Sequence, residues 1–333
     1  MTQLSLSSLG ERALIQRIAA KIAARLTSQP PWVLIGPGDD AAVIEPERGT
    51  HDVVTTDAVV EGVHFDRAFV PWDAVGHRAL AVNLSDLAAM GAHPRAALVS
   101  LVLPDTMDVE DVDRLLDGLL ALAAEHRVAV VGGNVTRSPG PLVVDVTAIG
   151  SVRPRRILTR AGARPGDEVW VTGSLGGAAV GLQILRGGGR EGAGIERYLR
   201  PIPRIRAGLL LGRNRAASSA MDLSDGLGDA VRQLAEASAV GMTIDAASLP
   251  LADGVREWHA SRGGDPLASA MAADDYELLF TVRPLQRGRL RGVRQQLGQL
   301  AMTKIGVVTK GRDVLLAEAA GTRELPQGFD HFQ

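Results

Sequence analysis

Cysteine is absent from all 333 residues. This absence excludes disulfide scaffolds, thiolate zinc sites and thiol nucleophiles. Lysine is scarce and occurs only at Lys21, Lys304 and Lys310. None of these lysines follows a glycine-rich loop, so the chain lacks the P-loop pattern G-x-x-x-x-G-K-[ST]. Any phosphate chemistry in this protein therefore has to use other groups.

Long apolar runs and charge of one sign are also missing. No segment approaches the roughly 20 apolar residues of a membrane span, and the Ser-rich residues 1–10 lack the features of a signal peptide. We therefore expect a cytoplasmic protein with no membrane partner. The 36 basic and 38 acidic residues give a net charge of −2, which does not indicate a nucleic-acid partner.

The length and the pattern of elements predict two domains of mixed α/β class. At roughly 150 residues per domain, a chain of this length forms two domains. A loop rich in Arg, Pro and Gly over residues 153–166 is the best boundary, which gives domains 1–152 and 153–333. Strands alternate with helices in both halves, which is typical of an α/β or α+β fold.

Hydrophobic periodicity predicts individual elements. Helices are expected over 11–26, 72–90, 109–126, 178–185, 227–237 and 285–297. Strands are expected after the glycine turn at 36–38 and over 52–57, 98–103, 128–131, 142–152, 168–172, 217–222, 242–245, 276–282 and 303–308. A Gly/Arg-rich surface loop is expected after residue 185.

Several aspartates lie beside glycines or at the ends of predicted strands. Carboxylates in such places suit hard cations such as Mg²⁺, and Asp40, Asp57 and Asp86 in the first half fit this description. In the second half, Asp222 and Asp225 lie three residues apart at a predicted helix start, where they would share a face and reach one metal ion. Helix capping is the other interpretation of this pair, and the sequence leaves both open.

Two glycine turns could contact an anion. Residues 171–177 connect a predicted strand to a predicted helix, where backbone N–H groups favour anions, although a purely structural turn is an equal alternative. Residues 130–137 form a second predicted turn, closed by Arg137, which suits bidentate contact with phosphate. His64 is the histidine of greatest interest, although a lone histidine is more often structural.

Taken together, these motifs resemble the thiamine-monophosphate kinase family. The matching strings run in order through nearly the whole chain: GDDAAV at 38–43, TTD at 55–57, EGVHF at 61–65, ALAVNLSDLAAMGA at 79–92, LTRAGARPGD at 158–167, DLSDG at 222–226, DYELLF at 275–280 and GFDHF at 328–332. The NLSDLAAMGA part also marks the related superfamily of ATP-dependent synthetases, which includes aminoimidazole ribonucleotide synthetase and selenophosphate synthetase.

The resemblance implies a fold and a reaction. The N-terminal domain would form a β-barrel across the two-fold axis of a homodimer, and the C-terminal domain would be α/β. The reaction would be transfer of the γ-phosphoryl group of ATP to thiamine monophosphate, which makes thiamine diphosphate with the help of several Mg²⁺ ions. Such transfers depend on positioning and charge neutralisation more than on a catalytic side chain.

The resemblance also implies roles for individual residues. The metal positions would be Asp40, Thr55, Thr56, Asp57, Asp86, Asn134, Asp222 and Asp225. The ATP positions would be Gly133, Asn134, Arg160 and Ser224. The thiamine-phosphate side would have His64, Asp274 and Phe329.

Two departures from the family pattern keep alternatives open. Asn134 stands where the family usually has a metal-binding aspartate, and Asp274 stands where it usually has glutamate. An asparagine still offers a carbonyl oxygen but no charge, so a non-catalytic nucleotide-binding homologue is one alternative. Another is a synthetase of the same superfamily with a different acceptor, although the lack of cysteine weighs against selenide as that acceptor.

Overall fold

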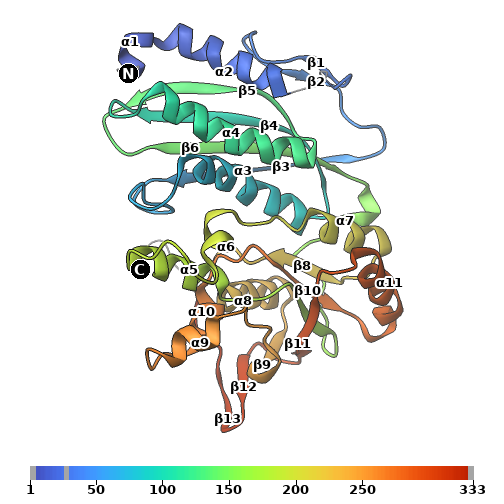
Figure 1. Ribbon diagram of the computed structural model, residues 1–333. Coiled ribbons are helices and arrows are strands. Elements are labelled where there is room, and N and C mark those ends of the chain that lie inside the picture. The colour runs from blue at the N-terminus through green and yellow to red at the C-terminus, as the bar shows by residue number, and fades with distance from the viewer. Residues whose placement is uncertain (1–4, 26–29, 329–333) are drawn as a thin grey trace. The chain divides into compact units, whose positions relative to one another are not determined.

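The computed structural model describes residues 5–25 and 30–328. The chain divides into two compact units, each built on its own β-sheet (Figure 1). Unit 1 comprises Met1–Leu87 and His93–Arg153, and unit 2 comprises Ala88–Ala92 and Pro154–Gln333. No helix within the described ranges is long and apolar enough to cross a bilayer.

Unit 1 contains a four-stranded sheet. Its strands, in spatial order, are β3 (His51–Val60), β6 (Val143–Val152), β4 (His93–Pro104) and β5 (Ala129–Ser138). The pairs are antiparallel except β4 with β5, which are parallel. Parallel neighbours need a crossover connection, which α4 (Val109–His126) supplies. A separate antiparallel pair joins β1 (Val33–Ile35) to β2 (Val43–Ile44).

Helices cover one face of this sheet. α3 (Trp72–Ala89) and α4 approach so closely that a side chain at Gly76 would lie 1.8 Å from the carbonyl oxygen of Leu115. The helices α1 (Leu6–Leu9) and α2 (Glu11–Arg25) lie on the side of α4 away from α3 (Figure 1). Lys21 Nζ of α2 lies 3.0 Å from Asp117 Oδ2 of α4. The other face of the sheet is open, with Val54 64% exposed and Leu98 36% exposed. The sheet is therefore single-sided within the chain, and it is not closed into a barrel.

Unit 2 contains a seven-stranded sheet. Its strands, in spatial order, are β13 (Gly321–Glu324), β12 (Val314–Glu318), β9 (Gly241–Asp245), β11 (Met302–Thr309), β7 (Glu168–Thr172), β10 (Leu278–Val282) and β8 (Ser219–Asp222). Only β12 with β9 is a parallel pair among these. The helices are α5 (Gly177–Arg186), α6 (Ile195–Leu199), α7 (Ile205–Asn214), α8 (Leu227–Ser238), α9 (Val255–Ala260), α10 (Pro266–Ala272) and α11 (Arg287–Leu297).

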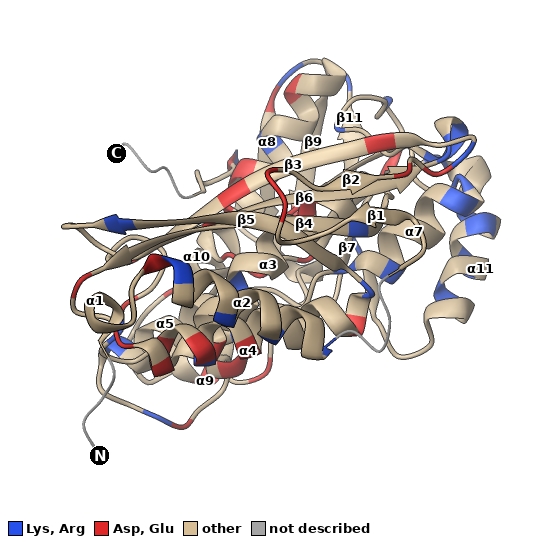
Figure 2. Ribbon diagram, turned by 90° about the horizontal axis from the view of Figure 1, so that it is seen from above, with Lys and Arg blue, Asp and Glu red and all other residues tan. Residues whose placement is uncertain are grey.

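The core of unit 2 forms where α8 packs on the sheet. Val231 and Leu234 of α8 are fully buried in the same apolar cluster as Ile244 and Leu316 of the strands. α11 lies mostly at the surface, because Leu290 and Val293 are its only buried residues. Its outward positions are arginines, which Figure 2 shows in blue along the helix. The 3.6-residue period therefore sets the orientation of both helices.

The six predicted helices are all present, with ends within two residues of the prediction. The predicted strands are also present, and several are longer than expected. The surface loop expected after residue 185 is present over residues 187–194, but α6 and α7, which follow it, were not predicted. Glycines lower helix propensity, but Gly212 of α7 is required by packing: a side chain there would lie 2.3 Å from the carbonyl oxygen of Arg156.

The predicted turn at 130–137 was also wrong. These residues belong to β5, which runs without interruption through Gly132 and Gly133. A side chain at Gly133 would lie 1.9 Å from the carbonyl oxygen of Val99 on the neighbouring strand, so close strand approach explains this glycine. Arg137 at the end of the strand pairs with Asp105 at 2.5 Å rather than closing a turn.

Candidate functional site

Unit 1 brings three of the predicted metal positions together on the helix side of β3. Thr55 Oγ1 donates a hydrogen bond to Asp86 Oδ2 of α3 at 2.5 Å. Because side chains alternate along a strand, Asp57 points to the same side as Thr55. Asn83, one turn before Asp86, donates to the carbonyl oxygen of Asp57 at 3.3 Å and ties α3 to this strand. The result is a set of hard oxygen donors anchored to a buried helix.

Thr56 and Asn134 lie on the opposite, open face of the sheet. Thr56 Oγ1 donates to Asp145 Oδ1 at 3.0 Å and lies 3.1 Å from Thr147 Oγ1. The strand register places Asn134 beside Ser100, which in turn lies beside Asp145, so these side chains share that face. The predicted metal positions of unit 1 are therefore divided between two faces of one sheet.

Two further predicted positions of unit 1 lie in loops. Asp40 is exposed between β1 and β2, and its backbone N–H donates to Asp39 Oδ1 at 2.9 Å. His64 follows β3 in a turn that needs Gly62 at φ 82°. The N–H of Val60 donates to His64 Nδ1 at 3.0 Å. A neutral His64 consequently carries its proton on Nε2, which makes that atom a hydrogen-bond donor.

In unit 2, Asp222 and Asp225 flank the loop between β8 and α8. Asp222 ends β8 and is 4% exposed, and α8 begins only at Leu227. The two carboxylates therefore precede the helix, so the predicted sharing of a helix face was wrong. Gly226, at φ 90°, ends the loop, and a side chain there would lie 2.1 Å from the carbonyl oxygen of Met271.

The neighbouring loop holds Asp274, the predicted substrate-side carboxylate. Backbone hydrogen bonds connect the two loops: the N–H of Leu223 donates to Glu277 O at 2.9 Å, and the N–H of Tyr276 donates to Leu223 O at 3.0 Å. Tyr276 adopts a left-handed φ of 52° within this connection. The loop of Asp274 and the loop of Asp222–Asp225 therefore lie side by side at the same end of strands β8 and β10.

Arg160 and Ser224, both predicted for ATP, lie at either end of α8. Ser224 Oγ donates to Asp225 Oδ2 at 3.4 Å in the loop before the helix. Arg160 Nη1 donates to Gln233 Oε1 at 2.5 Å on the helix itself. Ser238 at the end of α8 donates to the carbonyl oxygen of Arg160 at 3.1 Å. α8 thus holds Arg160, whereas Ser224 is held within the loop before the helix. Phe329 lies outside the described residues.

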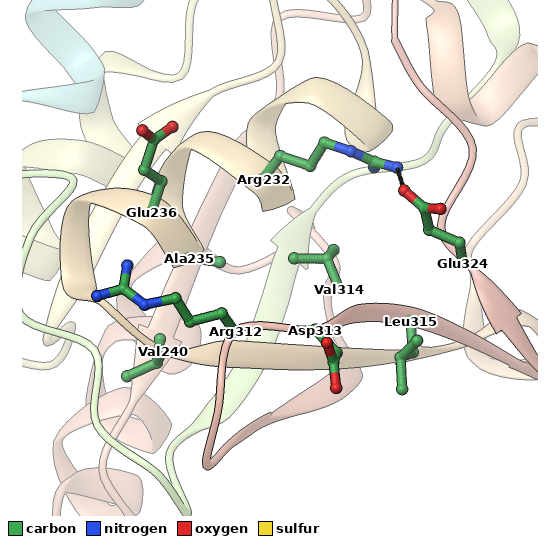
Figure 3. Close-up of a pocket in the computed structure, with 9 residues that line it drawn as sticks. All are labelled: Arg232, Ala235, Glu236, Val240, Arg312, Asp313, Val314, Leu315 and Glu324. Atoms are coloured by element: carbon green, nitrogen blue, oxygen red, sulfur yellow. Dashed lines mark hydrogen bonds and ion pairs between the residues drawn. The ribbon is translucent and has the colours of Figure 1, made fainter.

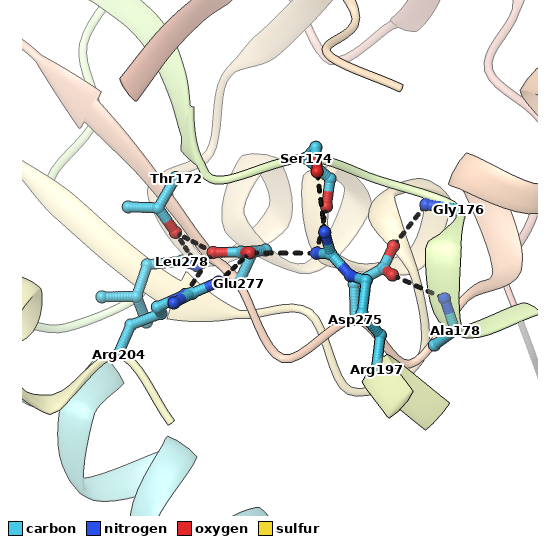
Figure 4. A network of polar contacts seen from close by, with 9 residues as sticks. All are labelled: Thr172, Ser174, Gly176, Ala178, Arg197, Arg204, Asp275, Glu277 and Leu278. Carbon is cyan, nitrogen blue, oxygen red and sulfur yellow. Dashed lines mark hydrogen bonds and ion pairs between the residues drawn. The ribbon is translucent and has the colours of Figure 1, made fainter. Parts of the chain in front are cut away.

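A buried ion-pair network, which the sequence did not predict, supports these two loops (Figure 4). The Glu277 side chain has no exposed surface and accepts hydrogen bonds from Thr172 Oγ1 at 2.7 Å and Arg204 Nε at 2.6 Å. Arg197 Nη2 adds a third donor at 3.2 Å. Arg197 lies in α6 and Arg204 directly precedes α7, two helices that were not predicted, so no local pattern indicated their role.

Asp275 occupies the glycine turn at 171–177. Its carboxylate accepts the N–H of Gly176 at 2.5 Å and the N–H of Ala178 at 3.1 Å, which caps α5. Burial raises the pKa of Asp275 to about 6, although Arg197 and the two N–H groups act in the opposite direction. Arg197 also donates to Ser174 Oγ at 2.7 Å. The anion at this helix start is the protein's own carboxylate, so the structural interpretation of the turn holds.

Comparison with known proteins defines the class. Residues 38–152 match the AIR synthase related protein, N-terminal domain, and residues 164–317 match the AIR synthase related protein, C-terminal domain. The chain is therefore an AIR synthase related protein of two domains.

Individual relatives narrow this class. The chain is 39% identical to the thiamine-monophosphate kinase of Escherichia coli K12, over 92% of this chain and 95% of that protein. The crystal structure of thiamine-monophosphate kinase from Stenotrophomonas maltophilia K279a is 38% identical, with a TM-score of 0.80 over 91% of this chain and 95% of that one. AaThiL complexed with AMPPCP and TMP is 32% identical, with a TM-score of 0.76 over the full length of both chains. The chain belongs to the thiamine-monophosphate kinase family.

Proposed function

We propose that this protein transfers the γ-phosphoryl group of ATP to thiamine monophosphate and so makes thiamine diphosphate. The observation that carries this proposal is full-length similarity to thiamine-monophosphate kinases, including AaThiL complexed with AMPPCP and TMP. Both substrates carry phosphate groups, and ATP is a cytoplasmic metabolite. We therefore also propose a cytoplasmic location.

The oxygen donors of both units fit Mg²⁺. This ion is usually held by one or two carboxylates together with substrate phosphates, rather than by an all-protein cage. In agreement with that, no three His, Asp or Glu side chains are grouped closely enough to hold a metal among residues 5–25 and 30–328. In unit 1, Asp57 and Asp86 would hold a Mg²⁺ ion. In unit 2, Asp222 and Asp225 would hold another. The metal would supply positive charge to the phosphate oxygens.

The protein groups would act by positioning. Thr55 orients the Asp86 carboxylate through its 2.5 Å hydrogen bond. His64 Nε2–H would donate to the phosphate of thiamine monophosphate, since its Nδ1 already accepts a backbone N–H. Arg160 and Ser224 would contact ATP, with Arg160 held by Gln233 of α8 and Ser224 held by Asp225 of the preceding loop. Phosphoryl transfer needs little more than such alignment and charge neutralisation.

We also propose that the open face of the unit 1 sheet is covered by the same face of a second copy. Val54 and Leu98 are exposed on it at 64% and 36%, and the β-branched side chains of Val102, Val143 and Ile149 are half-buried there. This face also carries the polar Thr56, Asp145 and Asn134. Its apolar side chains are the part that needs a cover. Pairing two such four-stranded sheets would close the expected β-barrel and produce a homodimer.

Release of ADP tests the proposed reaction. Purified protein with ATP and Mg²⁺ should release ADP when thiamine monophosphate is present, and not with thiamine or buffer alone. Thiamine diphosphate should accumulate in equal amount, measured by chromatography. No ADP above the buffer control with thiamine monophosphate would reject the kinase assignment.

A further inference from the structure

A hollow of 630 Å³ lies in unit 1, at the end of the sheet where β4 begins. Its lining residues are Pro30, Trp32, residues 45–48, residues 93–95 and Arg127. These residues form the unit 1 hollow, and its volume is typical of sites that bind small molecules.

The unit 1 hollow is separate from the metal positions predicted on the same sheet. His93 pairs with Ser151 of β6, whereas Thr56 pairs with Thr147 of that strand. Four residues along a strand correspond to about 13 Å, at about 3.3 Å per residue. The hollow and Thr56 therefore belong to different parts of unit 1.

Arg95 places a buried positive charge beside the hollow. It is 7% exposed, and its Cζ lies 4.4 Å from the centroid of the Trp32 ring. Nη2 donates to the carbonyl oxygen of Glu45 at 2.8 Å, whereas Nη1 is buried without a hydrogen-bond acceptor in residues 5–25 and 30–328. A buried charge that lacks a counter-charge is costly, so an anion in the hollow would stabilise Arg95. Because Nη1 is covered, Arg95 would attract that anion through its charge rather than by direct contact.

Two exposed arginines line the hollow as well. Arg48 lies between β2 and β3, and Arg127 directly follows α4. Neither forms an ion pair within the described part of the chain. Their guanidinium groups are therefore available to the oxygens of a phosphate group, which arginine contacts in a bidentate geometry.

The remaining lining residues provide two carboxylates and an apolar wall. Glu47 Oε2 accepts a hydrogen bond from Ser151 Oγ at 2.6 Å, so this carboxylate is already used by the sheet. Glu45 is exposed. Apolar surface comes from Trp32 and from three prolines, Pro30, Pro46 and Pro94. The hollow thus offers three guanidinium groups against two carboxylates, next to surface that suits the body of an organic molecule.

A hollow of unit 2 has the opposite charge balance (Figure 3). Arg232 and Arg312 line it together with three carboxylates, those of Glu236, Asp313 and Glu324. Arg232 Nη2 donates to Glu324 Oε1 at 3.1 Å, and its other hydrogen bonds go to backbone carbonyl oxygens. The protein itself satisfies Arg232, so the unit 2 hollow does not favour an anion.

We propose that the unit 1 hollow binds a small organic phosphate that has an apolar or aromatic body. Arg48 and Arg127 bind the phosphate oxygens, Arg95 supplies buried positive charge, and Trp32 contacts the body. A phosphate group close to dianionic suits three guanidinium groups better than a singly charged carboxylate does. The site does not depend on the proposed kinase reaction, because none of its lining residues is among the positions predicted for that reaction.

An NMR titration with phenyl phosphate tests binding at this place. The chain has four tryptophans, and the indole N–H signal of Trp32 is the one that Trp32→Phe lacks. Phenyl phosphate should shift this signal until it saturates, while the signals of Trp170 and Trp258 in unit 2 stay in place. Benzyl alcohol, which has the ring without the phosphate, should shift none of them. A Trp32 signal that phenyl phosphate leaves unchanged would overturn the proposal.

Variants of the two exposed arginines test the anion contact. Arg48→Gln and Arg127→Gln should each raise the Kd from the Trp32 titration about tenfold, as expected for losing a charged hydrogen-bonding group. Arg312→Gln in the unit 2 hollow is the matched control and should bind like the wild type. An unchanged Kd in both Arg48→Gln and Arg127→Gln would reject the site, because phenyl phosphate would then bind without these arginines.

Arg127→Gly separates loss of the contact from loss of folded protein. Arg127 has a left-handed φ of 57°, which glycine adopts without strain. This variant should bind as weakly as Arg127→Gln, while its midpoint of urea denaturation is no lower than that of the wild type. Wild-type affinity in a folded Arg127→Gly protein would remove Arg127 from the site.

Inorganic phosphate tests the apolar part of the site. It should shift the Trp32 signal with a Kd at least about fivefold higher than that of phenyl phosphate, because the buried ring adds apolar contact. Equal Kd values would reject binding of an organic body and leave a site for an adventitious ion only.

Discussion

The two units keep their carboxylates in contrasting surroundings. In unit 1, Asp57 is exposed on an edge strand and Asp86 accepts a threonine hydroxyl. In unit 2, Asp275 and Glu277 are buried, and arginines and backbone N–H groups occupy their oxygens. A buried carboxylate with fixed donors serves the fold, whereas the exposed Asp57 lies where a cation can approach it from solvent. The variants below test this contrast.

The largest expected effect is on stability, at the centre of the buried network. Glu277→Ala removes the buried carboxylate that pairs with Arg197 and Arg204, whose side chains are 32% and 19% exposed. The free energy of unfolding should fall by about 3 kcal/mol, the lower end of the range for breaking a buried ion pair. Glu168→Ala is the matched control, because Glu168 is also buried but its partners Arg287 and Lys304 are 59% and 45% exposed. Urea denaturation measures both. Equal losses in the two variants would mean that burial of the cations is not what matters.

The pH dependence of stability should report on Asp275. Its pKa is raised from 3.8 to about 6 in the folded protein, so the folded state holds this proton more tightly than the unfolded state. The stabilising contribution is full below the unfolded pKa and is lost as pH rises through the folded pKa. Between about pH 4.5 and about pH 7.5 the loss is about 2 kcal/mol.

Asp275→Asn cannot titrate and isolates this effect. The difference in unfolding free energy between wild type and Asp275→Asn should move against the wild type as pH rises across that range. Urea denaturation at several pH values provides the measurement, and Asp253→Asn, at an exposed position of unit 2, is the control. A difference that moves the other way would show that the carboxylate is held charged by Arg197.

The carboxylates proposed to bind Mg²⁺ in unit 1, Asp57 and Asp86, should matter for turnover rather than for folding. Asp86→Asn removes one charge that would hold Mg²⁺, and we expect kcat/KM to fall about a hundredfold because metal-bound charge contributes several kcal/mol. The free energy of unfolding should change by less than about 1 kcal/mol. ADP release at increasing Mg²⁺ measures the first quantity and urea denaturation the second. An Asp86→Asn enzyme as active as the control variant Asp113→Asn on α4 at every Mg²⁺ concentration would remove Asp86 from the metal site.

The open face of unit 1 predicts an effect on assembly. Val54→Asp places a charge in the centre of the proposed dimer contact, and we expect the dimer Kd to rise at least about tenfold. Ile202→Asp in unit 2 is a control of similar exposure, 60% against 64%. Sedimentation velocity over a range of concentrations measures both. If Val54→Asp associates like the wild type, this face does not form the dimer.

The smallest expected effect concerns Asn134. Asn134→Asp adds a carboxylate to the open face, with Ser100 of β4 between it and Asp145. We expect Mg²⁺ to be needed at a few-fold lower concentration for half-maximal rate. Thr136→Asp adds the same charge two residues along the same strand and serves as the control. An equal response in both variants would mean that charge alone, and not this position, matters.

The sequence predicted some elements of the fold and of the candidate site better than others. Helices with a clear 3.6-residue apolar period, such as α4 and α8, were predicted to within one residue. α7 was missed because Gly208 and Gly212 lower helix propensity and are retained for packing. The candidate residues came from family motifs. Their division between two faces of the unit 1 sheet became visible only from strand register, because neighbouring residues such as Thr55 and Thr56 point in opposite directions.

The sequence by itself determined the two-unit organisation of elements, the lack of thiol and P-loop chemistry, and the kinds of oxygen donors that the protein offers. Composition and local periodicity encode these properties, because each depends on residues that are close in the chain. Tertiary structure alone decided that Glu277 meets Arg197 and Arg204, that Asp275 caps α5, and that Pro326 meets Arg232 of α8. These contacts join residues 73 to 99 positions apart, and their energies depend on burial and geometry that no local pattern records.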